Sequence, residues 1–135
     1  MTFKLNHTIV HAYDKKVSAQ FFMEIFDVPE PRPFAHFLIV DLANEVTLDF
    51  RDSDEKKIQW QHYAFLVSEV QFDQIFGRVK ARGLDYWADP THLQKGEINH
   101  IFGGRGVYFN DPAGHYLEIF TRPPIPARGI QASGA

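Results

Sequence analysis

Two stretches of the sequence, LNHTIV at residues 5–10 and QHYAFL at residues 61–66, each place a histidine in an apolar strand pattern just before a helical pattern. The alignment that superposes His7 on His62 also superposes the helical segments that follow. A repeat of this length indicates two copies of one supersecondary unit. Two copies are too few for a solenoid, so the sequence predicts one pseudo-symmetric domain with a histidine at a related position in each half.

Each half also ends with a carboxylate inside an apolar strand pattern, Asp49 in VTLDF and Glu118 in YLEIF. An unpaired carboxylate in so apolar a strand would be costly, and imidazole together with carboxylate suits Mn, Fe, Ni, Co or Zn. We therefore expect His7, His62 and Glu118 to bind a metal ion. For Asp49 two interpretations stay open, a fourth ligand or a residue that supports the fold or the site without touching the metal.

The composition restricts the chemistry further. A chain of 135 residues, 44% of them hydrophobic, suits one domain with a core of its own. The net charge of −3 comes from mixed charges, 14 basic and 17 acidic, so we expect a small-molecule substrate and neither nucleic acid nor an anionic membrane as partner. The chain has no cysteine, which excludes disulfides, thiolate zinc sites and a cysteine nucleophile.

The sequence also gives an expectation for localisation. No apolar run approaches the roughly 20 residues that a membrane-spanning helix needs, and the N-terminus MTFKLNH lacks the apolar core of a signal peptide. We expect a cytoplasmic protein.

The periodicity predicts that each half begins with a strand, continues with a helix and ends with further strands. The expected elements of the first half are a strand over 3–10, with His7 on the same face as Phe3, Leu5 and Ile9, a helix from the N-cap Asp14 to about Phe26, and strands over 34–42 and 45–51. Those of the second half are a strand over 60–67, a helix from a Ser68–Gln71 capping box to just before Gly83, and strands over 84–87, 98–102, 105–110 and 115–121.

The domain boundaries follow from the polar stretch RDSDEKK at residues 51–57, which is the predicted linker. We expect a single domain over residues 1–122, built from βαβββ modules 1–55 and 56–122. The tail 123–135, which begins with closely spaced prolines, is expected to be loose or packed on a neighbour.

Together, LNHTIV, QHYAFLV and VYFNDPAGHYLEIF resemble the vicinal oxygen chelate superfamily over nearly the whole chain. That superfamily includes glyoxalase I, fosfomycin resistance enzymes, extradiol dioxygenases and bleomycin-binding proteins. The resemblance implies an α+β fold in which paired βαβββ modules form a cup-shaped mixed sheet around a divalent metal. It places the ligands on the first and last strands of each module, at His7, Asp49, His62 and Glu118, and it implies a homodimer whose sites draw ligands from both subunits.

The stretch INHIFGGRGVYFNDPAGHYLE, residues 98–118, is similar to the signature of type I extradiol ring-cleaving dioxygenases. His100, Tyr108 and Glu118 fall at its marked positions. The resemblance implies that His100 and Tyr108 contact the substrate, one for proton transfer and the other to orient a phenolate. One feature departs from the pattern, because the proton-handling histidine that those enzymes carry earlier would fall near Val46.

Three functions therefore stay open. An extradiol-type dioxygenase that uses Fe2+ or Mn2+ is the preferred interpretation. A glyoxalase-like lyase or isomerase or a fosfomycin-type thiol transferase, with Ni2+, Co2+ or Zn2+ as possible metals, is the second, although the fosfomycin enzymes carry a serine-bearing loop where this chain has FGGRG. A drug-binding protein of the bleomycin resistance type is the third, but such proteins generally lack the metal ligands.

The remaining histidines and the arginines complete the candidates. His115 follows the turn residues DPAG and is expected to hydrogen-bond the backbone or the neighbouring module rather than to act in catalysis. His11 and His92 are interpreted as lying outside the site. Three arginines are candidates for binding an anionic substrate, namely Arg105, Arg122 and Arg128.

Overall fold

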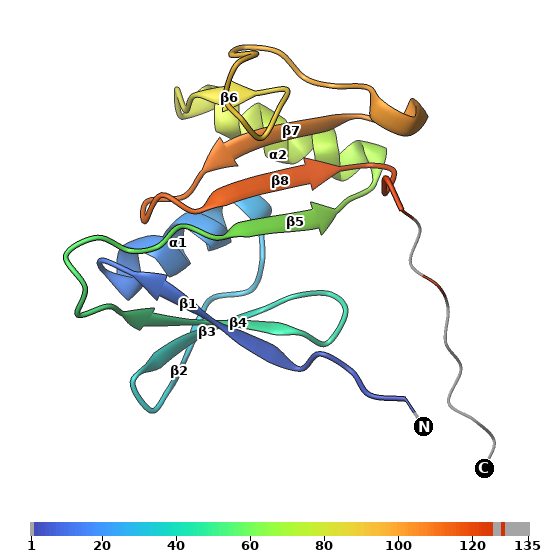
Figure 1. Cartoon of the computed structure of the whole chain (residues 1–135). Coiled ribbons are helices and arrows are strands. Elements are labelled where there is room, and N and C mark those ends of the chain that lie inside the picture. Colours follow the sequence, from blue (N-terminus) through green and yellow to red (C-terminus); the bar gives the residue numbers. More distant parts are fainter. Residues whose placement is uncertain (1, 126–127, 129–135) are drawn as a thin grey trace.

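The chain folds into two four-stranded mixed sheets with one helix each, arranged as βαβββ twice (Figure 1). This computed structural model describes residues 2–125 and 128. The strand order is β1-β4-β3-β2 in the first sheet and β5-β8-β7-β6 in the second. The prediction of paired βαβββ units is confirmed, while most of the tail predicted over 123–135 lies outside the described residues.

In each sheet the first strand pairs in parallel with the last, and the other pairings are antiparallel. The first unit consists of β1 (His7–Ala12), α1 (Lys15–Phe26), β2 (Arg32–Phe34), β3 (Phe37–Asp41) and β4 (Thr47–Asp52). The second consists of β5 (His62–Leu66), α2 (Glu69–Ala81), β6 (Tyr86–Trp87), the 3-10 turn η1 (Ile101–Gly103), β7 (Gly106–Asn110) and β8 (Tyr116–Phe120).

Two strand predictions were wrong in detail. The single strand expected over 34–42 is a hairpin, because Ala35 has a φ of 52° and reverses the chain between β2 and β3. The strand expected over 98–102 is instead a loop that enters η1, where Phe102 has a φ of 59°. Only an isolated bridge between Asn99 and Gly106 remains of the extended pairing there.

The predicted helix boundaries are confirmed by their caps. The Asp14 side chain accepts a hydrogen bond from the Lys16 N–H at the start of α1. Ser68 and Gln71 form the capping box of α2. Gly83 follows α2 with a φ of 68°, a conformation that favours glycine.

Both sheets bury one face and leave the other open. In β1, Val10 and Ala12 point into the core, whereas His7 and Ile9 lie on the opposite face. The predicted grouping of His7 with Ile9 is therefore correct, but this is the open face, with 41% of Ile9 exposed. In the view of Figure 1, α2 lies behind the second sheet, and α1 lies between the first sheet and β5.

The two units share one hydrophobic core. Phe22 and Phe26 of α1 reach across to Phe65 of β5, with ring centroids 6.1 and 5.0 Å away, and Phe26 also contacts Phe109 of β7 at 6.2 Å. Aromatic pairs at these separations add to the free energy gained by burial. The units are therefore held together by packing as well as by the chain that connects them.

A buried histidine adds a polar connection between the units. His115 is fully buried, and its Nδ1 accepts a hydrogen bond from the Gln61 N–H at 3.0 Å. Its Nε2 lies 2.8 Å from the carbonyl oxygen of His11. These partners require the neutral ring with the proton on Nε2. The expected structural role of His115 agrees with this geometry.

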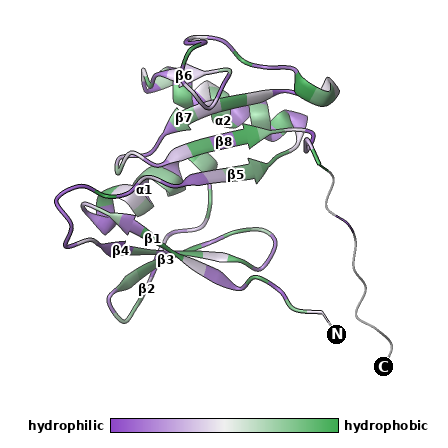
Figure 2. Cartoon of the chain, viewed as in Figure 1, coloured by the Kyte–Doolittle hydropathy of each residue, from purple (hydrophilic) through white to green (hydrophobic). Residues whose placement is uncertain are grey.

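The chain between β4 and β5, which contains most of the predicted linker, is hydrophilic along most of its length (Figure 2). Its apolar residue Ile58 is buried, and its N–H donates to the Tyr13 hydroxyl at 3.1 Å. Within the described residues, no helix is long and apolar enough to span a membrane.

Replacing the buried imidazole should weaken the whole fold. His115→Phe leaves the Gln61 N–H and the His11 carbonyl without their partner, so we expect a loss of about 2–4 kcal/mol in the free energy of unfolding, measured by urea denaturation. The control is His36→Phe at an exposed histidine, which should change stability by less than about 0.5 kcal/mol. Equal stability of the two variants would contradict the role of His115.

Candidate metal and substrate site

Three predicted site residues meet on the open face of the second sheet. His62 on β5, Glu118 on β8 and Tyr108 on β7 come from adjacent strands, and Tyr108 is directly paired with Glu118. The Nε2 of His62 lies 2.9 Å from Oε1 of Glu118. The rings of His62 and Tyr108 are 5.7 Å apart between centroids. The alternation of the strands thus turns the three side chains toward the same side.

The protonation of Tyr108 is set by its surroundings. Only 8% of the residue is exposed. Burial, together with the negative charge of Glu118, raises the pKa of Tyr108 far above its ordinary value because both disfavour the phenolate. At neutral pH the hydroxyl therefore keeps its proton and is available as a hydrogen-bond donor.

The other two predicted ligands lie on the open face of the first sheet. His7 Nδ1 donates to the side-chain oxygen of Asn6 at 2.8 Å, which leaves the Nε2 lone pair free for a ligand. Asp49 is largely buried, and its Oδ1 accepts a hydrogen bond from the Thr47 hydroxyl at 2.7 Å. Asp49 and His7 lie on neighbouring strands, β4 and β1, with their side chains on the same face.

A single chain does not bring the four predicted ligands together. Across residues 2–125 and 128, no three His, Asp or Glu side chains of one chain form a group that could hold a metal ion. The ligand set is divided into two pairs, His7 with Asp49 and His62 with Glu118. Each sheet therefore carries two of the four predicted ligands, and we call each pair a half-site.

The two half-sites suit a divalent metal in their donor atoms. All four residues offer nitrogen or oxygen, the ligands that Mn, Fe, Co, Ni and Zn accept. Neighbouring donors around an ion with bonds of about 2.1 Å lie roughly 3 Å apart, and the 2.9 Å between His62 and Glu118 matches this spacing. The pair can thus bind one ion with little rearrangement.

His100 makes no polar or ring contact with this cluster within the described residues. His100 is exposed and forms the N-cap of η1, outside the strands. Within the described residues, no hydrogen bond or ring contact connects it to the cluster of His62, Tyr108 and Glu118. Its predicted catalytic role therefore stays a prediction.

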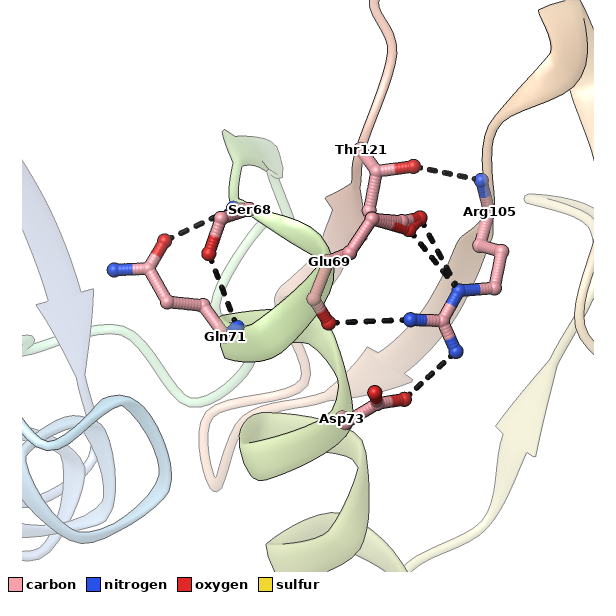
Figure 3. A network of polar contacts seen from close by, with 6 residues as sticks. All are labelled: Ser68, Glu69, Gln71, Asp73, Arg105 and Thr121. Carbon is pink, nitrogen blue, oxygen red and sulfur yellow. Dashed lines mark hydrogen bonds and ion pairs between the residues drawn. The ribbon is translucent and has the colours of Figure 1, made fainter.

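Arg105, one of the candidates for binding an anionic substrate, is already paired within the chain (Figure 3). Its guanidinium donates to the Asp73 carboxylate at 2.8 Å, to the Glu69 carboxylate at 3.4 Å and to the Glu69 carbonyl at 3.1 Å. It also covers the Phe72 ring at 4.3 Å. This arginine attaches the start of β7 to α2 and is not free for a substrate.

A row of stacked rings, which we call the aromatic row, borders the cluster and was not predicted. It consists of Trp60, Tyr116, His92 and Trp87, with successive centroids 4.2, 4.3 and 3.7 Å apart. Tyr116 shares the open face with Glu118 and pairs with His62. The four rings come from three separate segments, around residues 60, 87–92 and 116, so aromatic richness was the only signal in the sequence. His92, which we interpreted as lying outside the site, belongs to this row.

The loop that carries His92 is held by Asp89. Its carboxylate accepts hydrogen bonds from the Gln94 N–H at 2.7 Å, from the Leu93 N–H at 3.0 Å and from the Thr91 hydroxyl. The Thr91 hydroxyl contributes most to lowering the pKa of Asp89 to about 2. The carboxylate is thus ionised, and the loop ordered, at all but strongly acidic pH.

The fold is that of a glyoxalase-like protein. A solved structure of a glyoxylase/bleomycin resistance protein/dioxygenase domain from Frankia sp. EAN1pec shares this fold, with a TM-score of 0.67 and 19% identity over 90% of this chain and 93% of that one. No protein-family model matches the sequence.

Two further solved structures are much more similar in sequence. Oxidase ChaP-H1 is 53% identical over 90% of this chain and 98% of its own length, and oxidase ChaP-H2 is 56% identical over 91% and 96%, both with a TM-score of 0.88. Metallothiol transferase FosB from Shouchella clausii is 35% identical over 72 residues, which span 52% of this chain but only 45% of that relative. The chain belongs to the vicinal oxygen chelate superfamily.

Removing the Asp89 carboxylate should release the aromatic row. Because the pKa is lowered, the stabilisation by Asp89 is complete above the ordinary pKa of about 4 and is lost as the pH falls toward 2. We expect Asp89→Ala to lose the near-UV circular dichroism signal of the tryptophans at pH 7. The wild type should lose this signal only below about pH 4. Asp85→Ala, at an exposed ion pair with Lys95, should keep the signal. An unchanged spectrum of Asp89→Ala would contradict this account.

Proposed function

We propose that the protein is a divalent-metal-dependent dioxygenase of the extradiol type that acts on a small oxygen-chelating substrate, with Fe2+ or Mn2+ as the favoured metal. The observation that carries the proposal is the identity above 50% with two proteins named as oxidases, over nine-tenths of the chain. The nitrogen and oxygen donors of the two half-sites agree with it. The relatives named metallothiol transferases support a metal-dependent site in more general terms.

The residues of the site have distinct roles in this proposal. A bound divalent metal would polarise two oxygen atoms of the substrate. His62 and Glu118 hold it from the second sheet, and His7 from the first. Tyr108, protonated because its pKa is raised, donates a hydrogen bond to a substrate oxygen and orients it. His100 is assigned proton transfer, for which its loop must approach the cluster.

We infer that the working unit is a homodimer with two sites. Each site takes His7, with Asp49, from one copy and His62 with Glu118 from the other. The open faces that would meet carry exposed apolar side chains, including Ile9 at 41% and Leu66 at 63% exposure. Burial of such side chains against a second copy stabilises association.

Mixing two inactive variants tests this shared site. His7→Ala destroys the first half-site and Glu118→Ala the second, so neither homodimer should bind metal tightly. In a mixed dimer one of the two sites combines intact halves, and random pairing predicts about a quarter of the wild-type metal content. The two variants are unfolded and refolded together, and the metal content of the mixture is measured by elemental analysis. If the metal content does not recover, each chain forms its own site.

The reaction is tested by metal content and oxygen uptake. The protein is purified without oxygen, analysed for metal, loaded with Fe2+ and given a panel of catechols in an oxygen electrode. We expect oxygen consumption that depends on iron and on the substrate. Stoichiometric metal without oxygen uptake would contradict the dioxygenase. In the same assay, Asp49→Ala decides whether this carboxylate is a fourth ligand, because only then does metal affinity fall.

Tyr108→Phe should lower kcat by about 100-fold, since a positioned proton donor contributes on the order of 10²–10⁴ to a rate. Metal content should be unchanged because Tyr108 is not a proposed ligand. Tyr86→Phe is the matched control, because Tyr86 stacks edge-on with Phe76 away from the cluster. Wild-type kcat in Tyr108→Phe would remove this residue from the mechanism.

A fosfomycin-type thiol transferase is the second candidate, favoured by the partial match to FosB. Two observations weigh against it. Arg105 is saturated by Glu69 and Asp73, and Gly104 packs so closely that a Cβ would lie 2.7 Å from the Thr121 hydroxyl, which leaves no space for a serine. Thiol addition to fosfomycin without oxygen uptake would establish it. Full ligand affinity in metal-free protein would instead favour the drug-binding alternative.

A further inference from the structure

Arg51 is a half-buried cation on the open face of the first sheet that has no partner within the described residues. It lies on β4, where it pairs in register with His11 of β1. Its Nε is buried and makes no hydrogen bond. The neighbours Leu48 and Phe50 point into the core, so Arg51 points to the side of Asp49.

Four other arginines have acceptors, and Arg122, which makes no hydrogen bond or ion pair within the described residues, is exposed to solvent. Arg32 is paired with Asp41, and Arg82 with Glu24. Arg78 donates to the Ile25 carbonyl at 3.0 Å, and Arg105 is held by α2. The contrast identifies Arg51 as a cation whose acceptor is not supplied by the described part of its own chain.

Leaving a guanidinium donor buried and unpaired is unfavourable. A guanidinium offers only donors and no acceptor, and a buried donor without an acceptor costs about 1–3 kcal/mol. Asp49 does not relieve this cost, because its described hydrogen bond comes from the Thr47 hydroxyl. A guanidinium fits an anionic oxygen through paired charge-assisted hydrogen bonds. An acceptor from outside the chain would remove the penalty.

The position of Arg51 relates this acceptor to the metal half-site. Asp49 and Arg51 are two residues apart on one strand, so their side chains leave the same face about 6.6 Å from each other. This is about the width of one aromatic ring with its substituents. A ligand that binds metal beside Asp49 with one edge would reach Arg51 with the other.

We propose that Arg51 binds an anionic oxygen of the substrate, a carboxylate or an ionised hydroxyl, on the side of the ring away from the metal-binding oxygens. This inference rests on the proposed function for the location of the metal, and it adds a substrate class to it. The substrate is a chelator that carries a negative group next to its chelating edge. An uncharged catechol would leave Arg51 unpaired and bind more weakly.

The probes for the test are catechol and 2,3-dihydroxybenzoate, which differ by one carboxylate. Both are titrated without oxygen into Co2+-loaded full-length protein, and binding is followed by the visible spectrum of the metal and by calorimetry. The wild type should prefer 2,3-dihydroxybenzoate. Arg51→Gln should reduce this preference by roughly 10–100-fold, the loss of a charge-assisted hydrogen bond, with metal content and catechol affinity unchanged.

Two further variants separate the role of Arg51 from general effects of charge. Arg51→Lys keeps the charge and should restore part of the preference, although it loses the paired geometry. Arg32→Gln removes a positive charge from the same sheet, where Asp41 already neutralises it, and should leave the preference as in the wild type. If Arg32→Gln loses the preference for 2,3-dihydroxybenzoate to a similar extent, the effect comes from the overall electrostatic potential of the protein, and the proposal is overturned.

The remaining outcomes are distinct. An unchanged preference in Arg51→Gln overturns the role of Arg51, and if this variant also dissociates into monomers, the acceptor belongs to a second copy. Failure of metal loading overturns the proposed function. In that case benzoate and phenol are titrated into the metal-free protein, and a preference for benzoate that is lost in Arg51→Gln would still support the anion site. If the wild type binds none of the probes, both proposals fail.

Discussion

The burial of one face of each sheet against the helices is the constraint on which the rest of the structure depends. Side chains alternate along a strand, so a core face with Val10, Leu48 and Phe50 requires that His7 and Asp49 lie on the open face. The same relation in the second sheet places His62 and Glu118 opposite Leu117 and Ile119. A shift of one residue in either sheet would move the predicted ligands into the core.

The rigidity of this arrangement comes from contacts between segments far apart in the chain. The phenylalanines of α1 pack on β5 and β7, and His115 hydrogen-bonds both the end of β1 and the segment before β5. Arg105 attaches β7 to α2, and Asp89 orders the loop that completes the aromatic row. These contacts hold the open face of the second sheet in one geometry, which a site for metal and substrate requires.

The division of the ligands between two sheets separates folding from function. Each half-site forms as a consequence of its own βαβββ unit, and the shared core fixes the two units without joining the half-sites. In the proposed homodimer, metal binding by the four predicted ligands depends on how the open faces of two copies meet. The aromatic row and Arg51 lie on these same faces, one on each sheet.

The sequence by itself determined the order of elements, the helix caps and the strand faces on which the four predicted ligands lie, because strand alternation and capping are local properties that short motifs carry. The structural role of His115 was also predictable from the turn before it. The hairpin at Ala35 and the turn at Phe102 were not, since positive φ at residues other than glycine has no reliable local signal. Only the tertiary structure decided which arginines are already paired, that His92 joins Tyr116 and Trp87, and that one chain keeps its ligand pairs apart. These features depend on contacts between distant segments, which local sequence patterns do not encode.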